Sequence, residues 1–134
     1  MHPIRIDVIL EDLPKIRHAI PVIYHKKTVL LGLSNANDFR NNKWCFVAGH
    51  IKSSENPYQA AIREAREEAN LIIKCGDISF TDGPNIFIKA EAQSIKALKH
   101  NGEFKAMGFF DRKGMKSLKL CDNVLSVLDK MGLR

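Results

Sequence analysis

The sequence predicts an α/β fold, specifically an α/β/α sandwich in which helices cover both faces of a mixed β-sheet. Strand-like segments precede and follow one central amphipathic helix, and a second amphipathic helix lies near the end of the chain. The 134 residues, 45% of them hydrophobic and 27% charged, are typical of one soluble domain, residues 1–134, with a core of its own.

Strands are expected where β-branched and aromatic residues run between turn-forming residues. Residues 1–15 are compatible with an edge strand or a short lead-in. A hairpin is expected next, because two β-rich runs flank a short polar turn, and an Asn-rich loop and a short buried strand follow it. Four further strands and one turn complete the expected sheet. The ranges are 18–24 and 28–33 for the hairpin, 34–43 for the loop, 44–47 for the buried strand, 71–75, 78–81, 86–90 and 104–110 for the later strands, and 82–84 for the turn.

The central helix has clear signals at both ends. Asn56 is a good N-cap residue, Pro57 suits the first helical position, and Gln59 is placed to complete a capping box. Asn70 stands where the helix should end, and Asn is second only to Gly in adopting the left-handed conformation found there. The helix is therefore expected to run from residue 57 to residue 69.

One arc of this helix carries Glu64, Glu67 and Glu68, which at 100° per residue fall within about 100° of one another. An adjacent apolar arc is expected to face the core and contains Tyr58, Ala61, Ile62, Ala65 and Ala69. Like-charged neighbours destabilise a helix, and a hard divalent cation such as Mg²⁺ relieves their repulsion through oxygen ligands.

The acidic helix belongs to a longer spaced motif. Gly49 is followed six residues later by Glu55, then by Arg63-Glu64 and by Glu67-Glu68. Six such matches arise by chance with a probability on the order of 10⁻⁷ per window. The segment resembles the Nudix box, with Asn70 where that motif has its second Gly, and the chain therefore resembles a Nudix hydrolase.

The resemblance implies the same α/β/α sandwich and an enzyme that cleaves pyrophosphate bonds in compounds built as a nucleoside diphosphate linked to another group. It also implies a metal site. Glu64, Glu67 and Glu68 would coordinate Mg²⁺, with Mn²⁺ as the alternative, and the Gly49 carbonyl would be a further ligand.

Further roles follow from the same resemblance. Arg63 would orient Glu64, and Glu55 would support the loop or the metal ligands. Many Nudix enzymes carry another glutamate ahead of a late strand, and Glu103 is the candidate here, as a metal ligand or as the base, with Glu91 as its competitor. The general base is thus Glu64 or Glu103.

Three functions stay open. The first is a MutT-like hydrolase of a free (d)NTP or a modified nucleotide, the second an RNA 5′-pyrophosphohydrolase or decapping-type enzyme, and the third a catalytically silent nucleotide-binding module. Asn123, at the start of the terminal helix over residues 122–131, occupies a place where MutT-like enzymes recognise the base. Helix capping is the alternative role for Asn123.

Composition limits the partners and the compartment. The net charge of +6 favours polyanions, but the basic residues are dispersed and form no nucleic-acid module. No apolar run approaches membrane-spanning length. Three widely spaced cysteines, Cys45, Cys75 and Cys121, suit reduced thiols and hence a cytoplasmic protein. The resemblance implies that its partner is a nucleotide, a nucleotide-linked small molecule or an RNA 5′ end.

Overall fold

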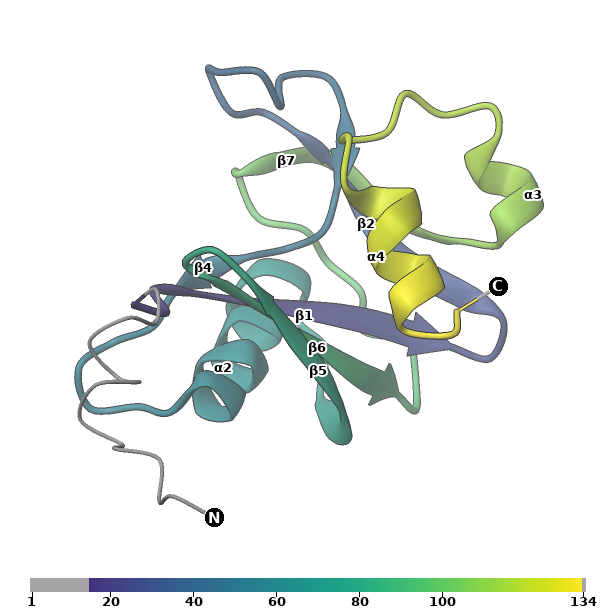
Figure 1. Ribbon diagram of the computed structural model, residues 1–134. Helices are drawn as coiled ribbons and strands as arrows, with labels where there is room; N and C mark the ends of the chain where they lie inside the picture. The colour runs from purple at the N-terminus through teal and green to yellow at the C-terminus, as the bar shows by residue number, and fades with distance from the viewer. Residues whose placement is uncertain (1–14, 134) are drawn as a thin grey trace, which may run out of the picture.

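The structure is a computed structural model that describes residues 15–133 (Figure 1). The strand or lead-in expected at residues 1–15 therefore lies almost wholly outside the described residues. Within them, seven strands form one sheet, with five in the order β3-β2-β1-β6-β5, β4 against β1, and β7 against β2. The strands are β1 (His18–His25), β2 (Thr28–Ser34), β3 (Trp44–Cys45), β4 (Gly49–His50), β5 (Ile73–Asp82), β6 (Asn85–Ala92) and β7 (Phe104–Phe110).

The sheet is mixed, as expected. β1 runs parallel to β6, whereas the β1–β2, β2–β7 and β5–β6 pairs are antiparallel. The connection from β1 to β6 carries the central helix α2 (Pro57–Ala69), and parallel neighbours need such a crossover. The predicted hairpin, the central helix and the mixed sheet are all confirmed.

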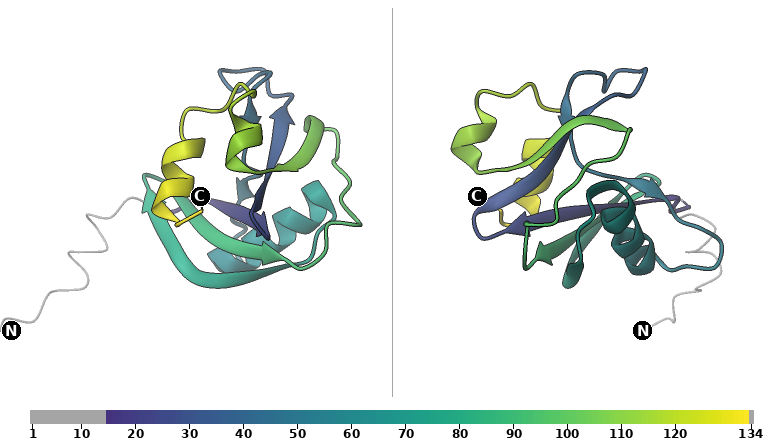
Figure 2. Two further views of the ribbon diagram at one scale, coloured as in Figure 1. Left: turned by 90° about the vertical axis from the view of Figure 1, so that its right-hand side faces the viewer. Right: turned by 180° about the vertical axis from the view of Figure 1, so that it is seen from behind.

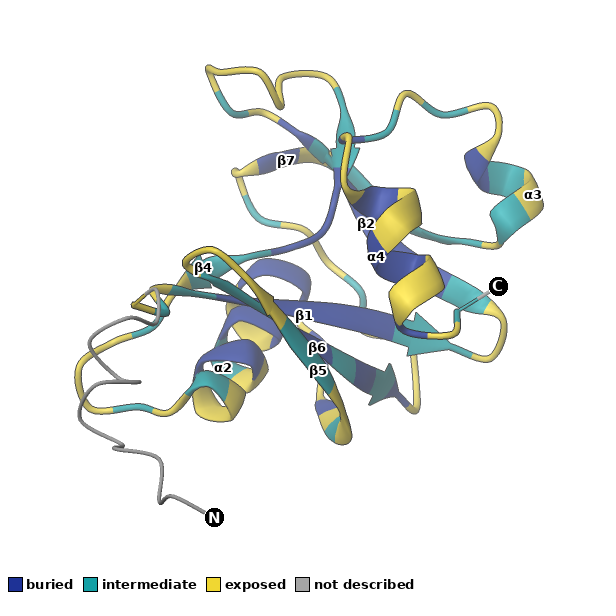
Figure 3. Ribbon diagram, in the orientation of Figure 1, coloured by how far each residue is buried: buried dark blue, intermediate teal, exposed yellow. Residues whose placement is uncertain are grey.

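Helices lie on both faces of the sheet (Figures 1 and 2). Side chains alternate between the two faces along each strand, so each face presents apolar side chains that a helix can cover. On β1, Ile20 and Val22 pack in a cluster with α4 (Val124–Lys130). Ile23 of the same strand packs on the opposite face, in a cluster that contains Ala65 of α2. On both α2 and α4, the buried residues are turned toward the strands and the exposed residues away from them (Figure 3).

Several boundaries differ from the prediction. The strand expected over residues 44–47 ends at Cys45, and β4 begins at Gly49. The two strands expected over 71–75 and 78–81 are one strand, β5, whose pairing with β6 shifts between Cys75 and Ser79. A short helix, α3 (Arg112–Met115), was not expected, and Asp111 caps it through the Gly114 amide. No described helix has the length and apolarity that crossing a membrane requires.

The buried face of α2 differs from the expected one. Its buried residues are Ala60, Ala61, Glu64, Ala65, Glu68 and Ala69. Tyr58 and Ile62 are 40% and 44% exposed, so the expectation that they face the core is wrong. The alanines allow the helix to approach β1 closely, and this rotation turns two of the three glutamates inward.

The expectation of three reduced cysteines is also wrong. Cys45 and Cys121 form a disulfide across 76 residues of sequence, and Cys75 is the free cysteine of the described chain. The two partners meet because Trp44 forms a bridge with Leu120, and the Cys121 amide donates to the Trp44 carbonyl. Sequence spacing contains no trace of this long-range pairing.

Candidate active site

The site begins where β4 passes over α2. Gly49 pairs with Ala19 of β1, and its Cα faces the Glu64 side chain. A Cβ at Gly49 would overlap the Glu64 carboxylate. The glycine of the motif is therefore required by close approach of a side chain, since its φ is not in the left-handed region.

Arg63 holds the acidic residues of the motif together. Its Nη1 donates to Glu64 Oε1 at 2.6 Å and to Glu67 Oε2 at 3.1 Å. Its Nη2 donates to Glu55 Oε1 at 2.7 Å and to the His50 carbonyl at 2.8 Å. One guanidinium thus links Glu64 to the β4 backbone and to the loop before α2. The orienting role of Arg63 in catalysis stays a prediction.

Glu55 closes that loop. It accepts hydrogen bonds from Arg63 and, at 2.9 Å, from the Lys52 amide. These donors, Arg63 first and Lys52 second, lower the pKa of Glu55 from its ordinary 4.5 to about 2. The position of Glu55 suits the supporting role predicted for it.

Glu103 is brought to the site by the segment that precedes β7. The Lys99 and Asn101 amides donate to the Ala69 and Glu68 carbonyls at 3.0 and 3.3 Å, which satisfies free carbonyls at the C-terminal end of α2. The Asn101 side chain then accepts from the Glu103 amide at 3.0 Å. The turn is therefore docked on the helix that carries the other glutamates.

The Glu68 carboxylate lies at the centre of this acidic group. Burial, and then the neighbouring Glu103 and Glu64 carboxylates, raise the pKa of Glu68 well above its usual range. Glu68 is only 4% exposed, and its Oε2 is buried with no hydrogen-bond partner. An unpartnered buried carboxylate oxygen is costly unless a cation or a proton satisfies it.

These residues fit a divalent cation. The described residues contain no ready-made group of three His, Cys, Asp or Glu side chains around one point. Glu67 is 54% exposed and is directed at Arg63. The orphan Glu68 oxygen, with Glu64 and Glu103 nearby, nevertheless offers the oxygen ligands that Mg²⁺ prefers.

Two hollows share Arg40, Cys45, Phe46 and Ala48 in their walls, and the first of them reaches the acidic group. The first, about 360 Å³, also includes Glu103 in its wall. The second, about 380 Å³, is lined by His18, Phe39, Asn85 and Asn123 among others. Together they offer room for a molecule the size of a nucleotide.

Asn123 lines the second hollow, and its side chain makes no capping hydrogen bond although it stands at the N-cap position of α4. Helix capping by its side chain is therefore wrong. Sequence reasoning missed His18, Phe39 and Arg40, which line the same hollow. A large aromatic residue in an otherwise polar loop, Phe39 within residues 34–43, was the available signal.

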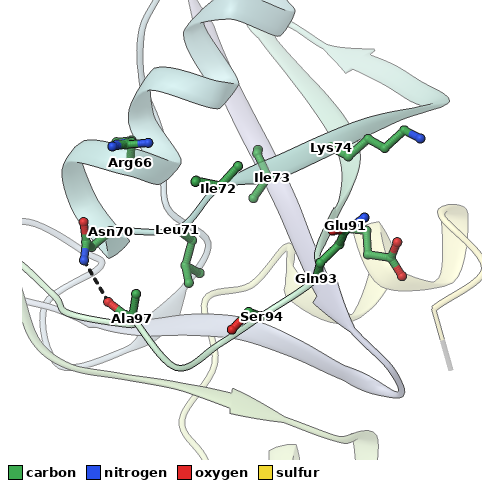
Figure 4. A pocket seen from close by; sticks show the side chains of 10 residues that line it. All are labelled: Arg66, Asn70, Leu71, Ile72, Ile73, Lys74, Glu91, Gln93, Ser94 and Ala97. Atoms are coloured by element: carbon green, nitrogen blue, oxygen red, sulfur yellow. Dashed lines mark hydrogen bonds between the residues drawn. The ribbon is translucent and has the colours of Figure 1, made fainter.

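Another hollow, about 490 Å³, lies away from the acidic group, between the end of α2 and the start of β5 (Figure 4). Asn70 donates there to the Ala97 carbonyl at 2.9 Å and ends α2 at φ 56°, as predicted. Glu91 lines this hollow instead of the acidic group. Glu91 is thus separate from the acidic group formed by Glu64, Glu68 and Glu103, and we assign it no part in the active site.

A model of the NUDIX domain matches residues 14–118 of the chain. No curated protein sequence matches it significantly. A NUDIX-family hydrolase from Clostridium perfringens superposes with a TM-score of 0.70 at 22% identity, over 90% of this chain and 99% of that one. A C. elegans Ap4A hydrolase gives 0.69 at 20%, over 87% and 95%. A bifunctional NMN adenylyltransferase/ADP ribose pyrophosphatase from Francisella tularensis, solved with AMP and a Mn ion, gives 0.63 at 14%, over 93% and 44%.

Proposed function

Because this chain belongs to the NUDIX domain family, we propose that it hydrolyses a pyrophosphate bond of a nucleotide, foremost a free (d)NTP or a modified form of one. Residues 1–134 would act as one catalytic domain. The observation that carries the proposal is the acidic group of Glu64, Glu68 and Glu103 beside hollows of nucleotide size.

The reaction is displacement at phosphorus by water. The water oxygen bonds to one phosphorus, the bond from that phosphorus to the bridging oxygen breaks, and a nucleoside triphosphate yields a nucleoside monophosphate and pyrophosphate. Glu64, Glu67, Glu68, Glu103 and the Gly49 carbonyl would hold Mg²⁺ or Mn²⁺. When bound, the cation neutralises charge on the phosphate oxygens and acidifies water.

The chain's own residues would orient the Glu64 carboxylate and accept the proton of the attacking water. Arg63 fixes Glu64 through the 2.6 Å ion pair, so that this carboxylate keeps one position relative to the β4 backbone. Glu64 or Glu103 would accept the proton of the attacking water. Glu64→Gln and Glu103→Gln distinguish the two, because loss of the base removes the acidic limb of the pH–rate profile.

The deciding experiment separates and identifies the two hydrolysis products, such as a nucleoside monophosphate and pyrophosphate or a sugar phosphate, formed from a panel of nucleotides. The panel contains (d)NTPs, an oxidised dNTP, nucleotide sugars, ADP-ribose, a dinucleoside tetraphosphate and triphosphorylated RNA, each with Mg²⁺, Mn²⁺ or excess EDTA. We expect the fastest turnover on a (d)NTP and none in EDTA. Full turnover in EDTA would overturn the metal dependence.

Other outcomes identify the alternatives. Turnover confined to RNA would establish a 5′-pyrophosphohydrolase, and preference for the dinucleoside or for ADP-ribose would match the activities named for two similar structures. Nucleotide binding without turnover, unchanged by Glu64→Gln, would establish a silent module.

Asn123 and the compartment complete the proposal. Asn123 would hydrogen-bond the base, so Asn123→Ala should reduce preference among bases.

We place the enzyme in the cytoplasm, where free nucleotides are abundant. The Cys45–Cys121 disulfide counts against a reducing compartment. Thiol alkylation in intact cells would decide between the cytoplasm and an oxidising compartment.

A further inference from the structure

The loop formed by residues 35–43 is anchored beside the acidic group. The loop protrudes at the top of Figure 1, between β2 and β3. The Asn35 amide donates to the Glu103 carbonyl at 3.1 Å, and the Ser34 amide donates to the Lys43 carbonyl at 2.9 Å. The Lys105 ammonium also donates to the Asn42 side chain. The base of the loop is therefore held against the turn that carries Glu103.

Arg40 is presented by this loop with one side of its guanidinium already oriented. Its Nη2 donates to Asp38 Oδ2 at 2.7 Å, and its Nε donates to both Asp38 oxygens at 3.1 and 3.2 Å. Nη1 makes no hydrogen bond within the described chain, and the side chain is 48% exposed. A guanidinium fixed on one edge and free on the other is suited to binding a phosphate oxygen.

Arg40 lies at the junction of the two hollows. It lines both the one that contains Glu103 and the one that contains Phe39 and Asn123. Among the described residues in those walls, it is the one permanently cationic side chain. Asp38 first, and the Glu103 charge to a smaller extent, raise the pKa of Arg40, which agrees with a position facing the acidic group.

The two hollows suit different parts of a nucleotide. Phe39 is 76% exposed at the wall of the second hollow, and Asn85 and Asn123 lie in the same wall. An aromatic face and amide groups fit a nucleobase, which stacks and hydrogen-bonds. The first hollow adjoins the carboxylates, where the scissile bond would lie. A phosphate placed at Arg40 is therefore the one between the nucleoside and that bond.

Resting on the proposed function, we propose that Arg40 binds the phosphate group that links the nucleoside to the scissile bond and remains on the nucleoside monophosphate product. Asp38 positions the guanidinium. The substrate class is then a nucleoside 5′-phosphate carrying at least one further phosphate. On this assignment the pyrophosphate product makes no contact with Arg40.

The test compares wild-type protein with Arg40→Gln and Arg40→Lys. For the NTP that the wild type hydrolyses, KM is measured together with the inhibition constants of the monophosphate and of inorganic pyrophosphate. We expect Arg40→Gln to raise KM and the monophosphate constant about 10- to 100-fold, as for a lost charged hydrogen bond. The pyrophosphate constant should stay within twofold. Arg40→Lys should lie between the two proteins.

Arg66→Gln is the matched control, because Arg66 is exposed on α2 and lines the unrelated hollow of Figure 4. It should match the wild type in every constant. An unchanged monophosphate constant in Arg40→Gln, or an equal loss of pyrophosphate inhibition, would overturn the assignment.

Calorimetric binding of the monophosphate separates this inference from the proposed function. If the wild type hydrolyses no nucleotide, the proposed function fails, while weaker monophosphate binding by Arg40→Gln still supports the assignment. Equal binding by the two proteins, or no binding by the wild type, overturns it.

Discussion

At the scale of single residues, the space left by Gly49 decides where the Glu64 carboxylate can sit. Any side chain at position 49 would occupy the volume of that carboxylate and displace it from Arg63. A motif glycine is often explained by backbone freedom. Here the reason is contact with a side chain.

We therefore expect Gly49→Ala to lower kcat by about 100-fold, since a displacement of about 1 Å in a catalytic group costs that much. Steady-state kinetics on the preferred nucleotide measures the effect. Gly76→Ala is the control, because a Cβ there meets its nearest neighbour, the Lys89 carbonyl, at an ordinary 3.5 Å. Equal activity of the two variants would refute the steric explanation.

Glu55 gives a prediction about acid. Its folded-state pKa of about 2 lies below its ordinary 4.5, so the unfolded chain binds more protons between these values. The stabilisation it provides is present above pH 4.5 and is lost as the pH falls toward 2. Urea unfolding across this window should show a shallower decline in stability for Glu55→Gln than for the wild type. Identical slopes would contradict the Arg63–Glu55 interaction.

At the scale of elements, helices α2 and α4 differ in how they begin. The Asn56 side chain accepts from the Gln59 amide at 2.9 Å, and the Gln59 side chain accepts from the Asn56 amide at 2.8 Å. Asn123 stands at the same position of α4 without such a bond. Two asparagines in equivalent places thus have different roles.

Asn56→Ala should lower the free energy of unfolding by about 1 kcal/mol, the usual value for a lost cap. Asn123→Ala should change it by less than about 0.5 kcal/mol, as for a surface substitution. Thermal or urea denaturation of both variants tests this directly. An equal loss in both would show that Asn123 stabilises α4 by a route other than a cap.

The helix ends were predictable because capping depends on residues within four positions of one another. Asn56, Gln59 and Asn70 carry that information locally, and all three behave as expected. The rotation of α2 depends on what the sheet offers for packing, so the exposure of Tyr58 and Ile62 was not visible in the helical periodicity. The periodicity located the glutamates without showing that Glu64 and Glu68 are buried.

At the scale of the whole molecule, the candidate site is assembled from segments that are distant in sequence. The spaced motif provides Glu64 and Glu68, the turn before β7 provides Glu103, and the loop after β2 provides Arg40. Only the motif could be recognised from residue spacing, while Glu103 was a candidate through its place ahead of a late strand, and Arg40 was not predicted. Glu103 and Arg40 reach the site through backbone hydrogen bonds at the base of the loop and at the end of α2, which no local pattern records.

The disulfide joins two distant segments of the wall of one hollow, because Cys45 and Cys121 both line the hollow that contains Asn123. Closing a loop of 76 residues restricts the unfolded chain, so Cys45→Ser/Cys121→Ser should lower the free energy of unfolding by about 2–5 kcal/mol. Cys75→Ser is the control and should unfold nearly as the wild type does. Thiol titration of the unfolded, non-reduced protein should find one reactive group, that of Cys75. Three reactive thiols would show that the bond is not formed, and the stability of the double variant would then match that of the control.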